Sequence, residues 1–103
     1  MQISEILLKG EQNARTAQDL CDIAERMGCT LTWRQLSRAI EAERRRGVPI
    51  CASCHSKTPG YYLAADKGEM KRYCDRLHHR AGEIYKTRRA CIKAIEKLPE
   101  GKV

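Results

Sequence analysis

The sequence predicts a mainly α-helical domain with a small β-hairpin and a long C-terminal helix. Three observations predict this class. Apolar residues recur at spacings of three and four in three segments before residue 47. Two short β-prone runs, residues 48–52 and 61–64, flank a polar segment that contains Pro59 and Gly60. Residues 66–98 contain no proline, so they can form one continuous helix.

The first two helices are expected before Gly28. Residues 3–8 are rich in Ile and Leu and predict a short apolar helix that ends at Gly10. Thr16, followed three residues later by Asp19, predicts the N-cap of a second helix. Gly28 ends this helix because glycine tolerates left-handed backbone geometry. Its expected apolar face comprises Ala17, Leu20, Cys21, Ala24 and Met27.

A third helix is expected over residues 32–46. Thr32 and Gln35 have the spacing of a capping box, in which each residue binds the backbone N–H of the other. The apolar spacing predicts that Trp33, Leu36 and Ile40 face the core.

The hairpin is expected to carry a long polar tip, residues 53–60. Pro49 cannot donate a hydrogen bond to a sheet, so it belongs near the start of its strand. Tyr61 and Tyr62 point to opposite faces of the second strand, and we expect Tyr62 to be the exposed one.

The last helix begins with a further capping pair, Asp66 and Glu69, and extends to about residue 98. A heptad-like apolar seam follows its length, and Arg88 interrupts that seam. The seam comprises Met70, Cys74, Leu77, Ala81, Ile84, Arg88, Cys91, Ile95 and Leu98.

This seam has two possible partners. Part of it can pack on the first helix of the same chain, or its distal half, residues 84–98, can pair with the same segment of a second copy of the chain. A helix of ~30 residues is ~45 Å long, which exceeds what a domain of this size can cover, and the overhang favours a homodimer. The expected organisation is a domain over residues 1–65, a C-terminal helix over 66–98 and a flexible tail over 99–103.

The charge is basic and unevenly distributed. The 103 residues include 20 Lys and Arg against 13 Asp and Glu, a net charge of +7. Residues 1–30 carry −2, whereas residues 31–47 carry +3 and residues 66–103 carry +5. Concentrated positive charge is typical of a polyanion partner such as nucleic acid, although surplus surface Lys and Arg is the plain alternative. No segment has the length of a membrane span and residues 1–10 do not resemble a signal peptide, so we expect a cytoplasmic protein.

The order of elements and one stretch of sequence resemble a known family. Helices over 16–27 and 32–46 are followed by Arg-Arg-Arg-Gly-Val-Pro-Ile (residues 44–50) and by Pro-Gly-Tyr-Tyr-Leu-Ala (residues 59–64). This pattern resembles a winged helix-turn-helix domain with three helices and a two-stranded wing, closest to the biotin-repressor type. The whole chain is also similar to small winged-helix proteins encoded in prophages of Gram-positive bacteria.

The resemblance implies that the third helix enters the major groove of double-stranded DNA. Arginine can bind guanine through two hydrogen bonds, and glutamine can bind adenine in the same way. The implied base-reading candidates are Arg34, Gln35, Arg38 and Arg45. Phosphate contacts are expected from Thr32, Ser37 and residues 44–46, and from His55 and Lys57 at the wing tip. A helix with a merely solvated polar face is the alternative.

The cysteines offer a competing interpretation. Cys51 and Cys54 have Cys-x-x-Cys spacing, and Cys74 lies one turn from His78, with His79 adjacent, so these residues can be combined into a Cys3His zinc set. Cys21, Cys74 and Cys91 fit apolar helix positions equally well, and a cytoplasmic chain is not expected to form disulfides. We therefore expect no cofactor.

No Ser/His/Asp set, phosphate-binding glycine loop or carboxylate pair stands out, so an enzyme with a small-molecule substrate is not expected. The expected function is sequence-specific, non-catalytic DNA binding by a phage or prophage regulator of transcription or replication. The alternatives are a zinc-stabilised protein-interaction module, an architectural DNA-binding factor in excision or packaging, and an adaptor that binds only proteins.

Overall fold

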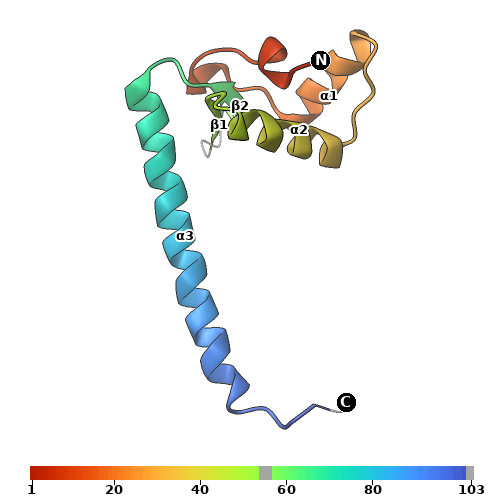
Figure 1. Cartoon of the computed structure of the whole chain (residues 1–103). Helices are drawn as coiled ribbons and strands as arrows, with labels where there is room; N and C mark the ends of the chain where they lie inside the picture. Colours follow the sequence, from red (N-terminus) through yellow and green to blue (C-terminus); the bar gives the residue numbers. More distant parts are fainter. Residues whose placement is uncertain (54–56, 102–103) are drawn as a thin grey trace. The chain divides into compact units, whose positions relative to one another are not determined.

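The computed structural model describes residues 1–53 and 57–101. Two short 3-10 helices, η1 (Ile3–Ile6) and η2 (Glu11–Asn13), precede the helices α1 (Ala17–Arg26) and α2 (Trp33–Arg45). The hairpin strands β1 (Ile50–Ser53) and β2 (Gly60–Leu63) and the helix α3 (Lys67–Ile95) complete the order (Figure 1). The expected mainly helical fold with an antiparallel hairpin and a long C-terminal helix is confirmed. The chain divides into an N-terminal unit, Met1–Tyr73, and a C-terminal unit, Cys74–Val103.

The first predicted helix is shorter than expected, because Ile3–Ile6 forms a single 3-10 turn and the chain is extended at Leu7. A four-residue segment makes too few hydrogen bonds to offset the cost of nucleating an α-helix. Its N–H groups instead find a partner on α2. The buried carboxylate of Glu43 accepts hydrogen bonds from the backbone nitrogens of Ile3 at 2.5 Å and Ser4 at 3.0 Å. This contact fixes the start of the chain against α2.

The helices α1 and α2 begin at the predicted caps. The Thr16 hydroxyl accepts from the Asp19 nitrogen at 3.1 Å. Both bonds of the Thr32 and Gln35 capping box are present, at 2.9 and 3.1 Å. Each helix ends at a glycine with positive φ, because only glycine adopts that conformation without strain.

The core of the N-terminal unit lies between η1, α1, α2 and the start of β1. Its largest buried side chains are Ile3, Leu20, Leu36, Ile40 and Ile50. The prediction that Trp33 joins them is wrong, because its side chain is 62% exposed. Trp33 is the first residue of α2, and side chains of a helix tilt towards its N-terminus. The ring therefore extends past the core.

The strands pair in the register Ile50 with Leu63 and Ser53 with Gly60, so both strands are displaced slightly from their predicted bounds. The segment before α1 continues this sheet. Arg15 and Tyr61 exchange two backbone hydrogen bonds at 2.8 and 2.9 Å. A Cβ on Gly60 would lie 2.1 Å from the carbonyl oxygen of Arg15, so this close approach requires glycine.

The predicted exposure of Tyr62 is also wrong, because Tyr62 is 1% exposed while Tyr61 is half-buried. Tyr62 packs with Cys51 and Tyr73 in a second buried cluster, against which Met70 also packs. The first turns of α3 therefore cover the face of the hairpin that was expected to meet solvent.

The helix α3 begins at the predicted cap, where the Asp66 carboxylate accepts from the Glu69 nitrogen at 2.8 Å. Tyr73 is its buried residue, and Met70 is half-buried. Beyond Tyr73 the described side chains are exposed except for the half-buried Arg76, so Cys74 and Cys91, at apolar positions of the seam, are exposed in the single chain. Within the described ranges, none of the helices has the length and apolar character that a bilayer crossing needs.

Candidate nucleic-acid interface

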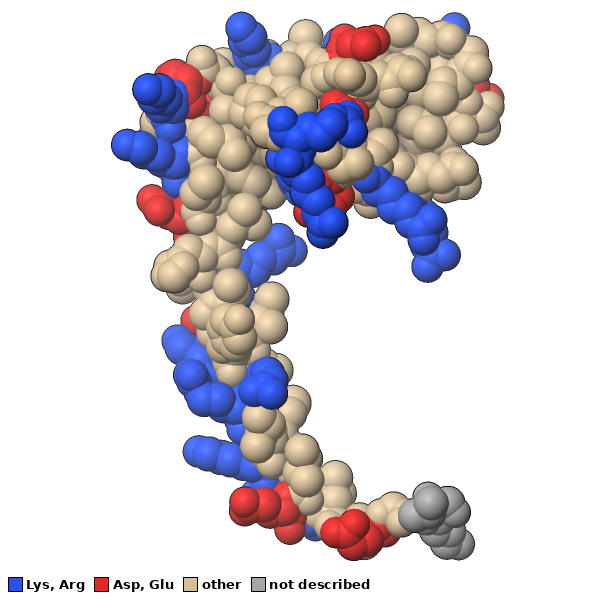
Figure 2. Space-filling view, in the orientation of Figure 1, with Lys and Arg blue, Asp and Glu red and all other residues tan. Residues whose placement is uncertain are grey.

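One face of α2 carries three exposed arginines. Arg34, Arg38 and Arg45 are separated by four and seven residues, so they point in nearly the same direction. The opposite face of α2 presents Leu36 and Ile40 to the core, which fixes the orientation of the arginines outward. Figure 2 shows long basic side chains projecting from the N-terminal unit into solvent.

An acidic residue lies within this arginine face. The carboxylate of Glu41 is 3.5 Å from Nε of Arg45 and 3.8 Å from a terminal nitrogen of Arg44. The Arg45 side chain is nevertheless 80% exposed. Glu41 therefore lowers the positive charge that the face presents to a polyanion.

Arg44, one of the three arginines expected to contact phosphate, makes contacts within the N-terminal unit. Its Nε donates to the carbonyl oxygen of Ile50 at 2.9 Å, and its Nη2 donates to the hydroxyl of Tyr73 at 2.9 Å. Its guanidinium also lies 5.5 Å from the centre of the Tyr73 ring. Arg44 thus joins α2 to β1 and to the first turns of α3, whereas Arg46 is exposed.

Thr32 and Gln35 are exposed, but their polar atoms are engaged in the capping box. Oε1 of Gln35 accepts from the Thr32 nitrogen at 2.9 Å. Recognition of adenine through two hydrogen bonds requires this same oxygen as an acceptor. Both residues are therefore best placed to define the start of α2. Ser37 is exposed near the arginines.

Two exposed apolar residues lie at the two ends of the connection between α1 and α2, and sequence reasoning missed the exposure of both. Trp33 is 62% exposed and Met27, at the end of α1, is 57% exposed. The exposure of Trp33 could have been predicted from its position directly after the N-cap, where a side chain extends beyond the packed turns of the helix. Periodicity alone assigned it to the core.

The wing tip is described only in part. His55 lies outside the described residues. Lys57 is exposed and lines a surface depression together with Glu11, Gln12, Thr58 and Glu69. A phosphate bound at Lys57 would meet two carboxylates there, so the electrostatics of this depression do not favour DNA.

The residues of the predicted zinc set differ in their surroundings. Cys51 is fully buried, and its Sγ is 3.6 Å from Sδ of Met70. Cys54 lies outside the described residues. Cys74 and His78 are exposed on the part of α3 that belongs to the C-terminal unit. Among residues 1–53 and 57–101, no group of three or more His, Cys, Asp or Glu side chains is arranged to hold a metal ion.

Cys21 is a core residue and not a reactive thiol. Burial raises the pKa of the Cys21 thiol, and the nearby Asp22 carboxylate acts in the same direction. The thiol therefore stays protonated at neutral pH and packs as a small apolar side chain.

Comparison with known proteins adds no further information on this surface. No protein-family model, curated protein sequence or solved structure matches the chain.

Proposed function

We propose that this protein binds double-stranded DNA sequence-specifically, without catalysing a reaction, as a winged helix-turn-helix protein whose recognition helix is α2. The observation that carries the proposal is the exposed Arg34, Arg38 and Arg45 face of a helix whose opposite face is buried. A rigid helix with outward arginines matches the width and polarity of the major groove.

The order of elements supports the winged assignment. Six residues, 27–32, connect α1 to α2, and the hairpin follows α2 after the turn at Gly47. Backbone pairing between Arg15 and Tyr61 holds the hairpin against the segment before α1. The resemblance to small prophage-encoded winged-helix proteins extends the proposal to a regulator of phage transcription or replication.

Within this interface the exposed residues have different roles. Arg34 and Arg38, nearest the N-terminus of α2, read bases, since recognition helices enter the groove by that end. Ser37, Arg45 and Arg46 bind phosphates, which position the protein without specifying sequence. Thr32 and Gln35 hold the first turn rigid through the capping box.

Trp33 adds an apolar contact to this set. Its ring is exposed one residue before Arg34, so a base-reading Arg34 brings it to the edge of the same groove. An apolar side chain there fits the methyl group of thymine or a sugar face.

The phosphate assignment is tested by the salt dependence of binding. Labelled duplex DNA is titrated with the full chain by fluorescence anisotropy at several salt concentrations, and emission from Trp33, the single tryptophan, is read in parallel. The double variant Arg45→Ala, Arg46→Ala loses two phosphate contacts, so its plot of log affinity against log salt is shallower by about two. Emission from Trp33 changes on binding.

The control is the charge-matched double variant Lys93→Ala, Lys97→Ala in the C-terminal unit, which keeps the wild-type slope. Equal slopes for wild type and for the Arg45 and Arg46 variant would remove these residues from the interface. Absence of any salt-dependent affinity for duplex DNA would overturn the proposed function and favour an adaptor that binds proteins.

A further inference from the structure

The C-terminal unit exposes an apolar stripe along α3. Leu77, Ile84, Ile92 and Ile95 are between 41 and 65% exposed. Tyr85 is 63% exposed beside them. At 100° per residue these side chains lie on one face of the helix, while Lys86 and Lys93 lie on the opposite face.

An amphipathic helix of this kind is stabilised mainly by burial of its apolar face. Single exposed apolar residues are common on protein surfaces, but a continuous row of them marks an interaction surface. The stripe therefore requires a partner.

Two pairs of residues along this face favour a second copy of the chain as that partner. The members of each pair lie equally far before and after Lys86 and match in size. Ala81 and Cys91, five residues away on either side, are both small. Leu77 and Ile95, nine residues away, are both large. Two antiparallel copies related by a two-fold axis at Lys86 bring these residues together, because an isologous interface pairs residue i with j and j with i.

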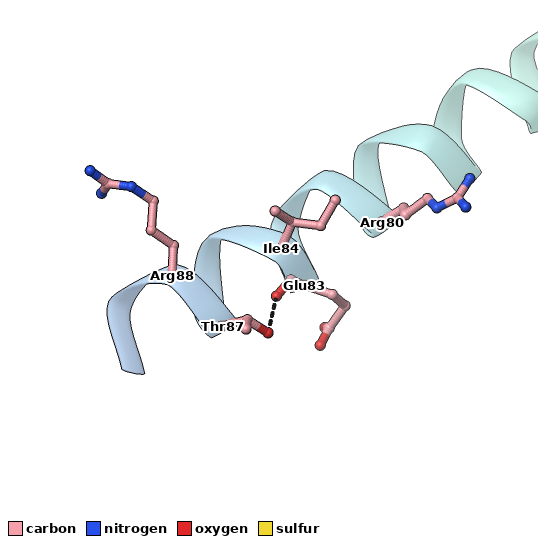
Figure 3. Close-up of a pocket in the computed structure, with 5 residues that line it drawn as sticks. All are labelled: Arg80, Glu83, Ile84, Thr87 and Arg88. Carbon is pink, nitrogen blue, oxygen red and sulfur yellow. Dashed lines mark hydrogen bonds between the residues drawn. The ribbon is translucent and has the colours of Figure 1, made fainter. Parts of the chain in front are cut away.

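Arg88 decides between antiparallel and parallel pairing. It lies at the centre of the stripe, and Figure 3 shows it projecting from the same side of α3 as Ile84. In a parallel, in-register pair each Arg88 faces the Arg88 of the other copy, which opposes two positive charges in an apolar layer. In the antiparallel pair each Arg88 faces Ile84 of the other copy.

The surface around Ile84 offers an apolar floor on which the stem of an arginine can pack. A shallow groove there is lined by Arg80, Glu83, Ile84, Thr87 and Arg88 (Figure 3). The Glu83 carboxylate on its wall binds Lys86 of its own helix at 3.0 Å. An arginine can pack its stem on Ile84 and keep its guanidinium in water, as long cationic side chains do at helix interfaces.

We propose that the C-terminal units of two chains pair as an antiparallel two-helix coiled coil centred at Lys86, with the Arg88 stem of each copy packed on Ile84 of the other. The pairing goes beyond the proposed function and does not rest on it, because every residue involved lies between Leu77 and Ile95. A two-fold dimer also predicts that a bound DNA site is a palindrome.

Disulfide formation distinguishes the two orientations. The parent protein is the full chain with Cys29→Ser and Cys54→Ser. The test variant adds Ala81→Cys to this parent, and both proteins are oxidised. The introduced thiol meets Cys91 of the other copy, so the variant forms a disulfide-linked dimer while the parent stays unlinked. A parent linked through Cys91 or Cys74 would show a parallel pair, and an unlinked variant would overturn the register.

Sedimentation equilibrium without DNA tests the pairing itself. The full chain is expected to dimerise at micromolar concentration, and Ile84→Asp to raise the dimer dissociation constant at least 100-fold. Lys93→Asp, the same new side chain on the opposite face, leaves it within about threefold. A wild-type protein that is monomeric at 100 μM, or equal effects of the two variants, would overturn the proposal and leave DNA binding untouched.

Discussion

Single polar residues explain how a small domain closes around its core. Glu43 is 2% exposed, yet its carboxylate is satisfied by the N–H groups of Ile3 and Ser4. Buried carboxylates are tolerated where such hydrogen bonds replace water. The first residues of the chain thus depend on one side chain that lies about 40 positions later.

The variant Glu43→Gln tests this dependence. The amide retains one acceptor oxygen and loses the charge, so one of the two N–H groups is left without its partner. The expected loss in the free energy of unfolding is ~1–3 kcal/mol, measured by urea denaturation. Glu41→Gln, an exposed change on the same helix, serves as the control and is expected to stay within ~0.5 kcal/mol of wild type. Equal stabilities of the two variants would contradict the buried role of Glu43.

Features that depend on neighbouring residues were predicted correctly, whereas features that depend on other elements were not. The caps at Thr16, Thr32 and Asp66 involve neighbours three residues away, so local sequence predicts them well. Tyr62 was misjudged because Met70 and Tyr73, on the helix that follows its strand, cover it. The contact of Arg44 with Tyr73 was not predicted because the two residues are far apart in the sequence. No local pattern shows that the start of α3 covers the hairpin.

At the scale of elements, α2 serves three purposes on three faces. Leu36, Ile40 and Glu43 lie in the core. Arg44 lies at one side, where it binds β1 and the first turns of α3. Arg34 and Arg38 lie outside. The candidate interface was therefore predictable from helical periodicity, whereas the structural role of Arg44 was not.

Glu41, the exposed acidic residue of α2, gives a prediction in which removal of a side chain's charge strengthens DNA binding. Glu41→Gln removes the one negative charge from the arginine face and frees Arg45 and Arg44 from their ion pair. Because exposed pairs are worth ~0–1 kcal/mol, affinity for DNA is expected to rise about two- to fivefold, measured by anisotropy at fixed salt. An affinity that is unchanged or lower would place Glu41 outside the DNA contact.

At the scale of the whole molecule, one helix belongs to both units. The first turns of α3 contribute Met70 and Tyr73 to the second core cluster of the N-terminal unit. The remainder of α3 exposes its apolar stripe. The sequence predicted the seam and its interruption at Arg88 from spacing alone. It did not predict where along α3 the packed residues end and the exposed ones begin, because this boundary depends on where the hairpin lies.

The central claim is that the outward arginines of α2 read a DNA sequence. Selection of bound sequences from a random duplex pool, run in parallel with wild type and Arg38→Ala, tests it most directly. Wild type is expected to select one defined site, and the variant to lose preference at the position that Arg38 reads, with ~1–3 kcal/mol lower affinity for the wild-type site. A wild-type pool with weak sequence preference would indicate architectural binding, and an unchanged selection by Arg38→Ala would contradict the assigned recognition face.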